Sequence, residues 1–367
     1  MAVFKIMRFT EFAMAYRTCC RRYCTTEEVY TLSKKKIPHP YLNIHPWKSE
    51  HEFTKYLLNN IIYNADGIVA INKPYGISTR DKSANNNDFS AKKFNTIVGA
   101  VDYSINGVLP YIAKELNIPA LIPCTGLEKY TSGVYVLATN NDIQQQVQKA
   151  VKRAVAFNKF KRYWAITIKH PNEIKGSYRL AVKSQQSQLG LKRPVFVNKW
   201  SKNEEKRKDV MIMNVKYKLL SNSTYNLSSL IEIESPARKW QCIRLFASVM
   251  LHSPILGDNF HGSRVQNIMG TWMKVDPFAD SCLEMPKINR QLLELLKLTP
   301  RQQEIIPTHL HVRSICLDGF GKEKKNLVLK APLTHPFDWT CKQLMFKNIP
   351  CEANYTSVED KIPCEIL

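Results

Sequence analysis

One acidic side chain, Glu128, stands at the entrance to a buried apolar segment, where a fold can present a reactive group. It follows a turn that contains Gly126 and precedes a small-residue corner, Thr-Ser-Gly, at 131–133. The apolar run 134–138 then predicts a buried strand. A carboxylate at the mouth of such a strand can act as a nucleophile or as a base. The pattern alone leaves open that Glu128 is only a solvated turn residue.

Basic residues and an aromatic residue follow this apolar run in the sequence. Residues 142–157 predict an amphipathic helix with Asn140 or Asn141 as its N-cap, and the next predicted strand contains Tyr163. Cations at the end of a helix either offset its dipole or contact phosphates, and a tyrosine ring either packs in the core or stacks on a base. The cations are Lys152, Arg153, Lys161 and Arg162.

Arg244 lies in an otherwise apolar segment, between Ile243 and Leu245. A buried guanidinium needs a charged partner, and we expect that partner to be Glu128. His309 and His311 share a face of a predicted strand. No third ligand accompanies them, so we expect no metal site.

The composition indicates a polyanionic partner. The chain has 367 residues, and 53 Lys+Arg against 31 Asp+Glu give a formal charge of +22. Such an excess is typical of nucleic-acid binding, and general basicity is the alternative. The ten cysteines include no Cys-x-x-Cys pair, so we expect free thiols and no zinc. No apolar run reaches the ~18 residues of a spanning helix, and no Gly-rich phosphate loop supports a metabolic α/β enzyme.

The first 24 residues contain five basic residues and one acidic residue, Glu11, among apolar side chains. This pattern is typical of a mitochondrial transit peptide, with a basic tail as the alternative. Removing it takes away a net charge of +4 and leaves +18, so the basicity belongs to the remaining protein.

Periodicity predicts further elements along the chain. Residues 61–79 indicate a strand and a Pro/Gly turn, residues 105–116 an amphipathic helix, and residues 81–97 a mobile polar loop. Residues 197–215 are expected to form an exposed, charge-rich connector. Strands are expected near 215–220 and 228–234.

Taken in order, these segments resemble the motifs of the RluA-type RNA pseudouridine synthases, and most closely the mitochondrial branch of that family. The resemblance covers about residues 61–340. Its parts are Asn-Lys-Pro-Tyr-Gly at 72–76, Leu127 with Lys129 and Thr-Ser-Gly at 131–133, Lys-Arg-Tyr-Trp-Ala at 161–165, Ile243-Arg244, and Ser-Pro-Ile-Leu-Gly-Asp at 253–258. The family's His, Arg and catalytic Asp fall on Thr125, Gly126 and Glu128, and its His-Gln pair falls on Gln241 and Cys242.

The resemblance implies an α+β pseudouridine synthase fold, with a mixed or antiparallel central sheet, flanking helices and a basic RNA-binding cleft. It implies catalysis by Glu128, Tyr163 and Arg244 without a metal or an organic cofactor. The implied RNA contacts are Lys73, Lys129, Lys152, Arg153, Lys161 and Arg162. The expected organisation is a transit peptide at 1–24, an N-terminal extension at 25–60, a synthase-like domain at 61–340 and a tail at 341–367.

The expected function is that of a mitochondrial matrix protein that binds mitochondrial rRNA or mRNA and is not inserted in a membrane. Uridine isomerisation is expected to be weakened, because Glu128 is one methylene longer than the family's Asp and Gly126 stands where the family has an Arg. The alternative is a fully active synthase that uses Glu128.

Overall fold

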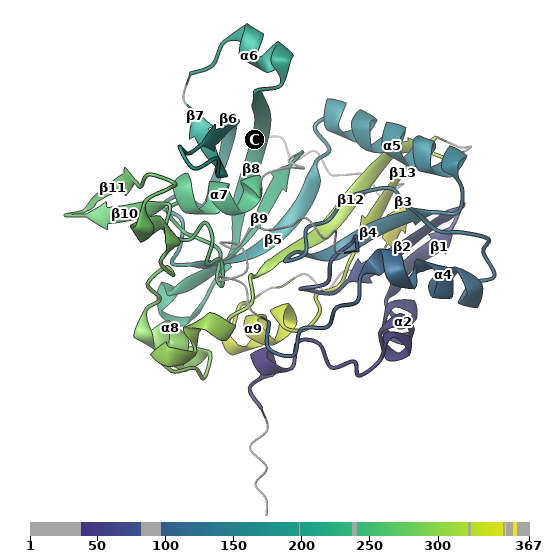
Figure 1. Cartoon of the computed structure of the whole chain (residues 1–367), viewed down its shortest axis with the longest axis horizontal. Coiled ribbons are helices and arrows are strands. Elements are labelled where there is room, and N and C mark those ends of the chain that lie inside the picture. The colour runs from purple at the N-terminus through teal and green to yellow at the C-terminus, as the bar shows by residue number, and fades with distance from the viewer. Residues whose placement is uncertain are drawn as a thin grey trace, which may run out of the picture. The chain divides into compact units, whose positions relative to one another are not determined.

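A twelve-stranded mixed sheet forms the centre of the structure (Figure 1). The computed structural model describes residues 38–81, 97–197, 199–236, 241–321, 324–347, 349 and 355–357. The main strand order is β1-β2-β4-β12-β5-β9-β8-β6-β7, and β3, β13 and β14 pair beside this path. Neighbours along the path are antiparallel except β4 and β12, which run parallel. A separate hairpin is formed by β10 and β11.

The strands are β1 (Ile61–Ala65), β2 (Ile68–Lys73), β3 (Ile122–Pro123), β4 (Ser132–Ala138), β5 (Lys161–Ile168), β6 (Lys175–Gln186), β7 (Lys192–Val197), β8 (Val210–Asn222), β9 (Ser228–Ser235), β10 (Val265–Ile268), β11 (Thr271–Lys274), β12 (Leu310–Phe320), β13 (Lys325–Lys330) and β14 (Tyr355–Ser357). The α-helices are α2 (Glu50–Asn59), α4 (Ile105–Glu115), α5 (Asn141–Ala156), α6 (Lys202–Arg207), α7 (Cys242–Val249), α8 (Arg290–Leu295) and α9 (Phe337–Gln343). Short 3₁₀ turns are η1 (Pro40–Leu42), η2 (Thr224–Asn226), η3 (Asp280–Leu283) and η4 (Pro300–Ile305).

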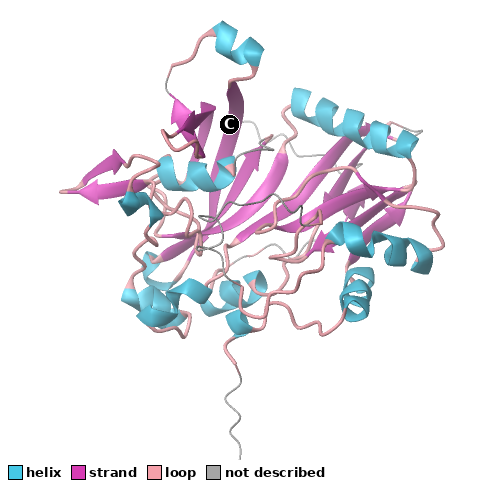
Figure 2. Ribbon diagram, viewed as in Figure 1, coloured by secondary structure: helices cyan, strands magenta, loops and turns pink. Residues whose placement is uncertain are grey.

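Helices pack against both faces of the sheet, and the side chains of a strand alternate between the two layers (Figure 2). In β4, Val134 and Val136 belong to the apolar cluster that contains buried residues of α5. Tyr135 and Leu137 belong to the cluster that contains α2 and α4. All seven residues of β4 are buried, and they include the run 134–138 that the sequence predicts to be a buried strand.

Helix α5 starts where the sequence predicts. The side chain of Asn140 accepts a hydrogen bond from the backbone amide of Ile143, so Asn140 is the N-cap. The predicted apolar face contains Ile143, Val147, Val151 and Ala154. The last three are buried, and Ile143 is half-buried. This helix places its basic C-terminal end beside the start of β5.

These elements confirm the expected α+β class, with a mixed sheet and flanking helices. Within the described ranges, no helix has both the length and the apolarity that crossing a bilayer requires.

The folded unit extends beyond the boundaries expected from the sequence. Within the described ranges, the compact unit begins at Pro40. Phe53 and Leu57 of α2 are completely buried, so residues 40–60 of the expected N-terminal extension contribute to the core. Cys341 and Leu344 are buried as well, so the start of the expected tail belongs to the core.

The expected connector at 197–215 is also more ordered than predicted, because it contains α6 and the first residues of β8. The expected transit peptide at 1–24 and residues 82–96 of the expected loop lie outside the described residues.

Candidate active site

A cavity of about 260 Å³ brings together the three residues expected to be catalytic. Glu128 comes from the loop before β4, Tyr163 from β5 and Arg244 from α7. The volume lies just below the ~300–1000 Å³ range of small-molecule sites, so the cavity suits one small ring system. The other lining residues are Cys124, Thr125, Gly126, Leu127, Thr131, Gln148, Val151, Lys161, Gln241, Cys242, Ile243 and Leu310.

Close packing of two strands fixes the loop that holds Glu128. Gly133 has a φ of +113°, and a Cβ atom there would lie 2.3 Å from the carbonyl oxygen of Val312. Only glycine allows β4 and β12 to approach this closely. The backbone amide of Thr131 donates to the carbonyl of Glu128 at 3.2 Å, which closes a turn just before the strand.

The side chain of Lys73 holds the same loop through hydrogen bonds to backbone carbonyl groups. Its ammonium group donates to the carbonyl oxygens of Pro74 (3.0 Å), Lys129 (3.2 Å) and Thr131 (2.9 Å). The side chain is fully buried, and burial, aided by the charge of Lys129, lowers its pKa to about 7. The expectation that Lys73 contacts RNA is therefore wrong, because its donors are occupied inside the protein.

The surroundings of Glu128 disfavour the ionised form of its carboxyl. Burial raises the pKa of its carboxyl above the ordinary value, while the Arg244 guanidinium opposes that shift. Asp258 also raises the pKa, and a hydrogen bond from the backbone amide of Gln241 lowers it. Because Gln241 is the N-cap of α7, the carboxyl lies at the positive end of that helix.

Arg244 forms its ion pair with Asp258 and not, as expected, with Glu128. Both side chains are buried. The same oxygen of Asp258, Oδ1, also accepts from the backbone amides of Phe260 (3.1 Å) and His261 (3.0 Å). Burial alone would raise the pKa of Asp258, but Arg244 outweighs that effect and holds it at about 2. Asp258 therefore remains charged and keeps Arg244 in the cavity wall.

The family's motif places its His-Gln pair on Gln241 and Cys242, but no role was expected for Gln241. Its φ of +52° is a left-handed conformation that nothing in the local sequence indicates. Its side-chain oxygen, Oε1, lies 3.0 Å from Nε2 of His261, a residue buried beside Asp258. Gln241 thus links the loop of Glu128 to the Arg244–Asp258 pair.

Tyr163 is largely buried, and its ring forms part of the cavity wall. Lys161, two residues earlier on β5, lines the cavity too. The other cations expected to bind RNA are exposed, namely Lys129, Lys152, Arg153 and Arg162. Arg162 pairs with Glu234 at 3.1 Å, so it has a structural role as well.

Thr125 and Gly126 line the same cavity as Glu128. The hydroxyl oxygen of Thr125 is buried, and no hydrogen-bond partner for it occurs among the described residues. Apart from its two chain neighbours, no described residue has a heavy atom within 4 Å of a Cβ atom built on Gly126, and the backbone of Gly126 is not in the left-handed region. Neither the fold nor the local packing therefore requires glycine at this position.

The two histidines have protein partners. His311 Nδ1 lies 2.9 Å from Ser132 Oγ, and His309 Nε2 lies 2.7 Å from Thr340 Oγ1. Among the residues that the structure describes, no group of three potential metal ligands occurs.

Similar proteins share much of this chain's length. It is 27% identical over 307 residues to "Pseudouridylate synthase RPUSD4, mitochondrial" of Mus musculus, which covers 80% of this chain and 70% of the relative. It is 24% identical over 306 residues to "Mitochondrial mRNA pseudouridine synthase RPUSD3" of Homo sapiens, covering 81% and 79%. It is 26% identical over 210 residues to "Ribosomal large subunit pseudouridine synthase C" of Rickettsia felis, covering 57% and 58%.

The fold matches the solved structure of "Human RNA Pseudouridylate Synthase Domain Containing 4". The TM-score is 0.57 and the identity is 24%, over 81% of this chain and 97% of that one. No family model matches the chain.

Proposed function

Because the chain belongs to the RluA-type pseudouridine synthases, we propose that it isomerises uridine in mitochondrial RNA and that Glu128 is the acting carboxylate. The observation that carries the proposal is the single cavity that holds Glu128, Tyr163 and Arg244. The relatives with mitochondrial names support the compartment. An excess of 22 positive charges supports a polyanionic substrate.

The reaction breaks the bond between C1′ of the ribose and N1 of uracil and forms a bond from C1′ to C5. The proton leaves C5, N1 regains one, and no atom is gained or lost. The uridine must first leave its stack and enter a pocket. In the cavity, the Glu128 carboxylate acts at C1′ or on the C5 proton, and the Tyr163 ring lies against the base. The guanidinium of Arg244, held in place by Asp258, favours the ionised form of this carboxylate, and the charge of Asp258 opposes it.

Substitution of Glu128 tests this proposal on purified protein and unmodified mitochondrial rRNA and mRNA transcripts. We expect Glu128→Ala to abolish pseudouridine formation and Glu128→Asp to keep or raise it, because Asp restores the family's shorter reach. RNA affinity should be the same for all three proteins. Pseudouridine formed equally by wild type and Glu128→Ala would contradict the role of Glu128.

A second candidate is an RNA-binding protein that has the same fold and no longer isomerises uridine. The observation that favours it is the empty space at Gly126, where the family's motif has an Arg. In that case neither Glu128 variant changes any modified site, yet loss of the whole protein still disturbs mitochondrial RNA. Pseudouridine mapping with and without the protein, combined with the Glu128 series, separates the two candidates.

The proposal includes residence in the mitochondrial matrix, with residues 1–24 as the transit peptide. The Arg-rich, acid-poor start supports this. Fusion of residues 1–30 to a fluorescent reporter tests it, and a cytosolic or nuclear signal would contradict it. Mitochondrial rRNA and mRNA are the proposed substrates, and no metal or organic cofactor is required.

A further inference from the structure

A large share of the positive charge of the chain lies in one segment whose outer end extends away from the cavity. Residues 175–222, which form β6, β7, α6 and β8, are called the basic arm below. These 48 residues contain twelve Lys+Arg and three Asp+Glu, a net charge of +9 out of +22. The other 319 residues share the remaining +13. The arm is therefore several times more positive per residue than the rest of the protein.

Local contacts hold the outer part of the arm in place. Ser201 and Glu204 form a capping box at the start of α6, and Lys183 of β6 pairs with Glu204 at 3.0 Å. Arg207 pairs with Asp209 at 2.9 Å. These pairs occupy two of the arm's three acids, and they fix α6 to the strands.

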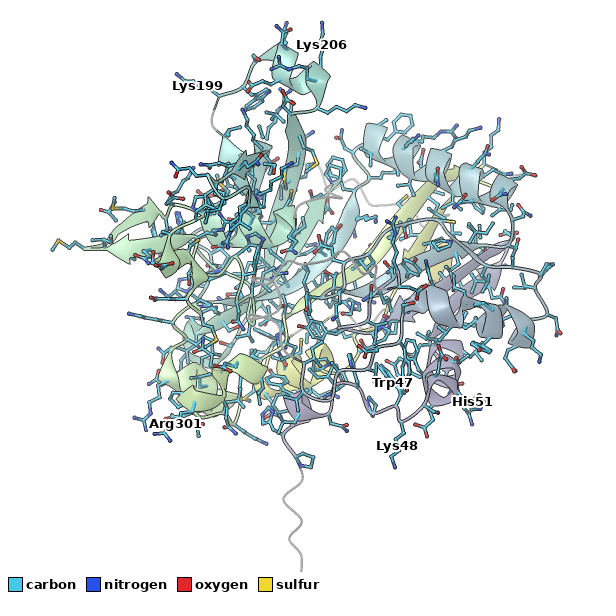
Figure 3. All side chains as sticks on the ribbon, viewed as in Figure 1. Trp47, Lys48, His51, Lys199, Lys206 and Arg301 are labelled. Carbon is cyan, nitrogen blue, oxygen red and sulfur yellow. The ribbon has the colours of Figure 1, made fainter. Side chains whose placement is uncertain are left out.

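The remaining cations are available to a partner. Seven lysines of the arm are exposed and form no ion pair with any residue in the described ranges: Lys175, Lys192, Lys199, Lys202, Lys206, Lys208 and Lys216. Figure 3 shows Lys199 and Lys206 at the outer end of the arm, pointing away from the sheet. The arm's aromatic side chains are buried or half-buried, namely Tyr178, Phe196, Trp200 and Tyr217.

The base of the arm is packed against the wall of the active-site cavity. Phe196 of β7 packs with Leu245 and Val249 of α7, the helix that contains Arg244. The guanidinium of Arg193 lies over the rings of Phe260 (5.4 Å) and Phe278 (5.9 Å). An RNA that delivers a uridine to the cavity would therefore pass close to the arm.

We propose that the basic arm binds the sugar–phosphate backbone of a double-helical RNA segment next to the target uridine. This inference rests on the proposed function, because it assumes an RNA substrate. Unpaired exposed lysines without exposed aromatic rings fit phosphates and not stacked bases. Double-helical RNA is recognised in this way, through its shape and its backbone. An acidic protein would fit the same charge and is an outcome of the test below.

The test compares two triple variants that change net charge equally. The arm variant is Lys202→Glu, Lys206→Glu and Lys208→Glu. The control is Lys287→Glu, Lys297→Glu and Arg301→Glu, at exposed positions near α8 and η4 that form no ion pair within the described ranges. Figure 3 places Arg301 far from Lys206. Lys208 and Lys297 both have a positive φ, so the backbones are matched too.

Binding is measured from 50 to 200 mM salt, with a mitochondrial rRNA transcript and with a short single-stranded oligouridine. We expect the arm variant to bind the transcript about tenfold or more weakly, with a salt slope smaller by about 2–3. The affinity of the control variant for the transcript should fall by less than about threefold. The affinities of the wild type, the arm variant and the control for oligouridine should agree within about threefold. A variant with Lys202→Gln, Lys206→Gln and Lys208→Gln should lose less, and unchanged thermal unfolding confirms that each variant is folded.

If the arm variant and the control lost the same affinity for the transcript, the proposal would be overturned. Binding would then depend on the overall positive charge of the protein and not on the arm. Unchanged affinity of the arm variant would also overturn the proposal and leave an acidic protein as the partner. Wild-type protein that binds the transcript but forms no pseudouridine would contradict the proposed isomerisation and leave the arm proposal standing. Wild-type protein that binds neither RNA would overturn both.

Discussion

Glu128 must be charged to act as a nucleophile or a base, yet its surroundings favour the neutral form. Burial raises the pKa of its carboxyl, and the nearby Arg244 offsets only part of that effect. At a pH below the ordinary pKa of a glutamate, the carboxyl is neutral in both the folded and the unfolded protein. As the pH rises through the raised pKa, the folded protein must accept a poorly solvated charge. The free energy of unfolding therefore falls.

Glu128→Gln should remove this cost and stabilise the protein while abolishing isomerisation. We expect a gain of about 1 kcal/mol at pH 8 that disappears toward pH 4, measured by urea unfolding at each pH. Glu304→Gln, at an exposed position, serves as the control and should change little at either pH. A gain from Glu128→Gln that is independent of pH would contradict the assigned cause.

The same raised pKa predicts the acid limb of the pH–rate profile. The rate should fall as the pH drops through the pKa of Glu128, and this should occur at a higher pH than an ordinary glutamate would give. In Glu128→Asp the acid limb of the pH–rate profile should lie at a different pH, because the shorter side chain changes how deeply the carboxyl is buried.

At the scale of the elements, the contact between β4 and β12 determines where the site forms. Gly133→Ala would place a methyl group 2.3 Å from a carbonyl oxygen at a φ of +113°. We expect a loss of about 3 kcal/mol or more in the free energy of unfolding. Gly126→Ala is the matched control, because it adds the same atom in open space, and it should change stability by less than about 0.5 kcal/mol. Similar losses for the two variants would contradict this interpretation of the strand contact.

The elements themselves were predictable because their signals are local. The apolar run of β4, the Asn140 cap and the buried face of α5 each depend on neighbouring residues. The partners of charged groups were not predictable in this way. Arg244 was expected to pair with Glu128 and pairs with Asp258, and Lys73 was expected to contact RNA and is buried. Both outcomes depend on how segments far apart in the sequence pack together.

At the scale of the whole molecule, the core includes residues that precede the recognisable motifs. Phe53 and Leu57 are completely buried beside β2 and β4. A chain that begins at Pro40 should unfold at the same temperature as the full chain. One that begins at Ile61 should be strongly destabilised, since each large apolar side chain lost from a core costs about 2–5 kcal/mol. Thermal unfolding measures the difference, and equal midpoints would show that residues 40–60 are dispensable.

The parallel pairing of β4 with β12 also affects the order of events during synthesis. Ser132 and His311 face each other in this pair, although 179 residues separate them. At about 5–20 residues per second, a ribosome needs roughly 10–35 s to add that length of chain. Throughout this interval β3 pairs with this edge of β4 only at Leu137 and Ala138, and the part that will receive β12, at Ser132 and Gly133, is unpaired. An unpaired strand edge is prone to misassociation. A newly made chain therefore acquires Glu128 early but completes the surroundings of this residue only when most of the protein has been synthesised.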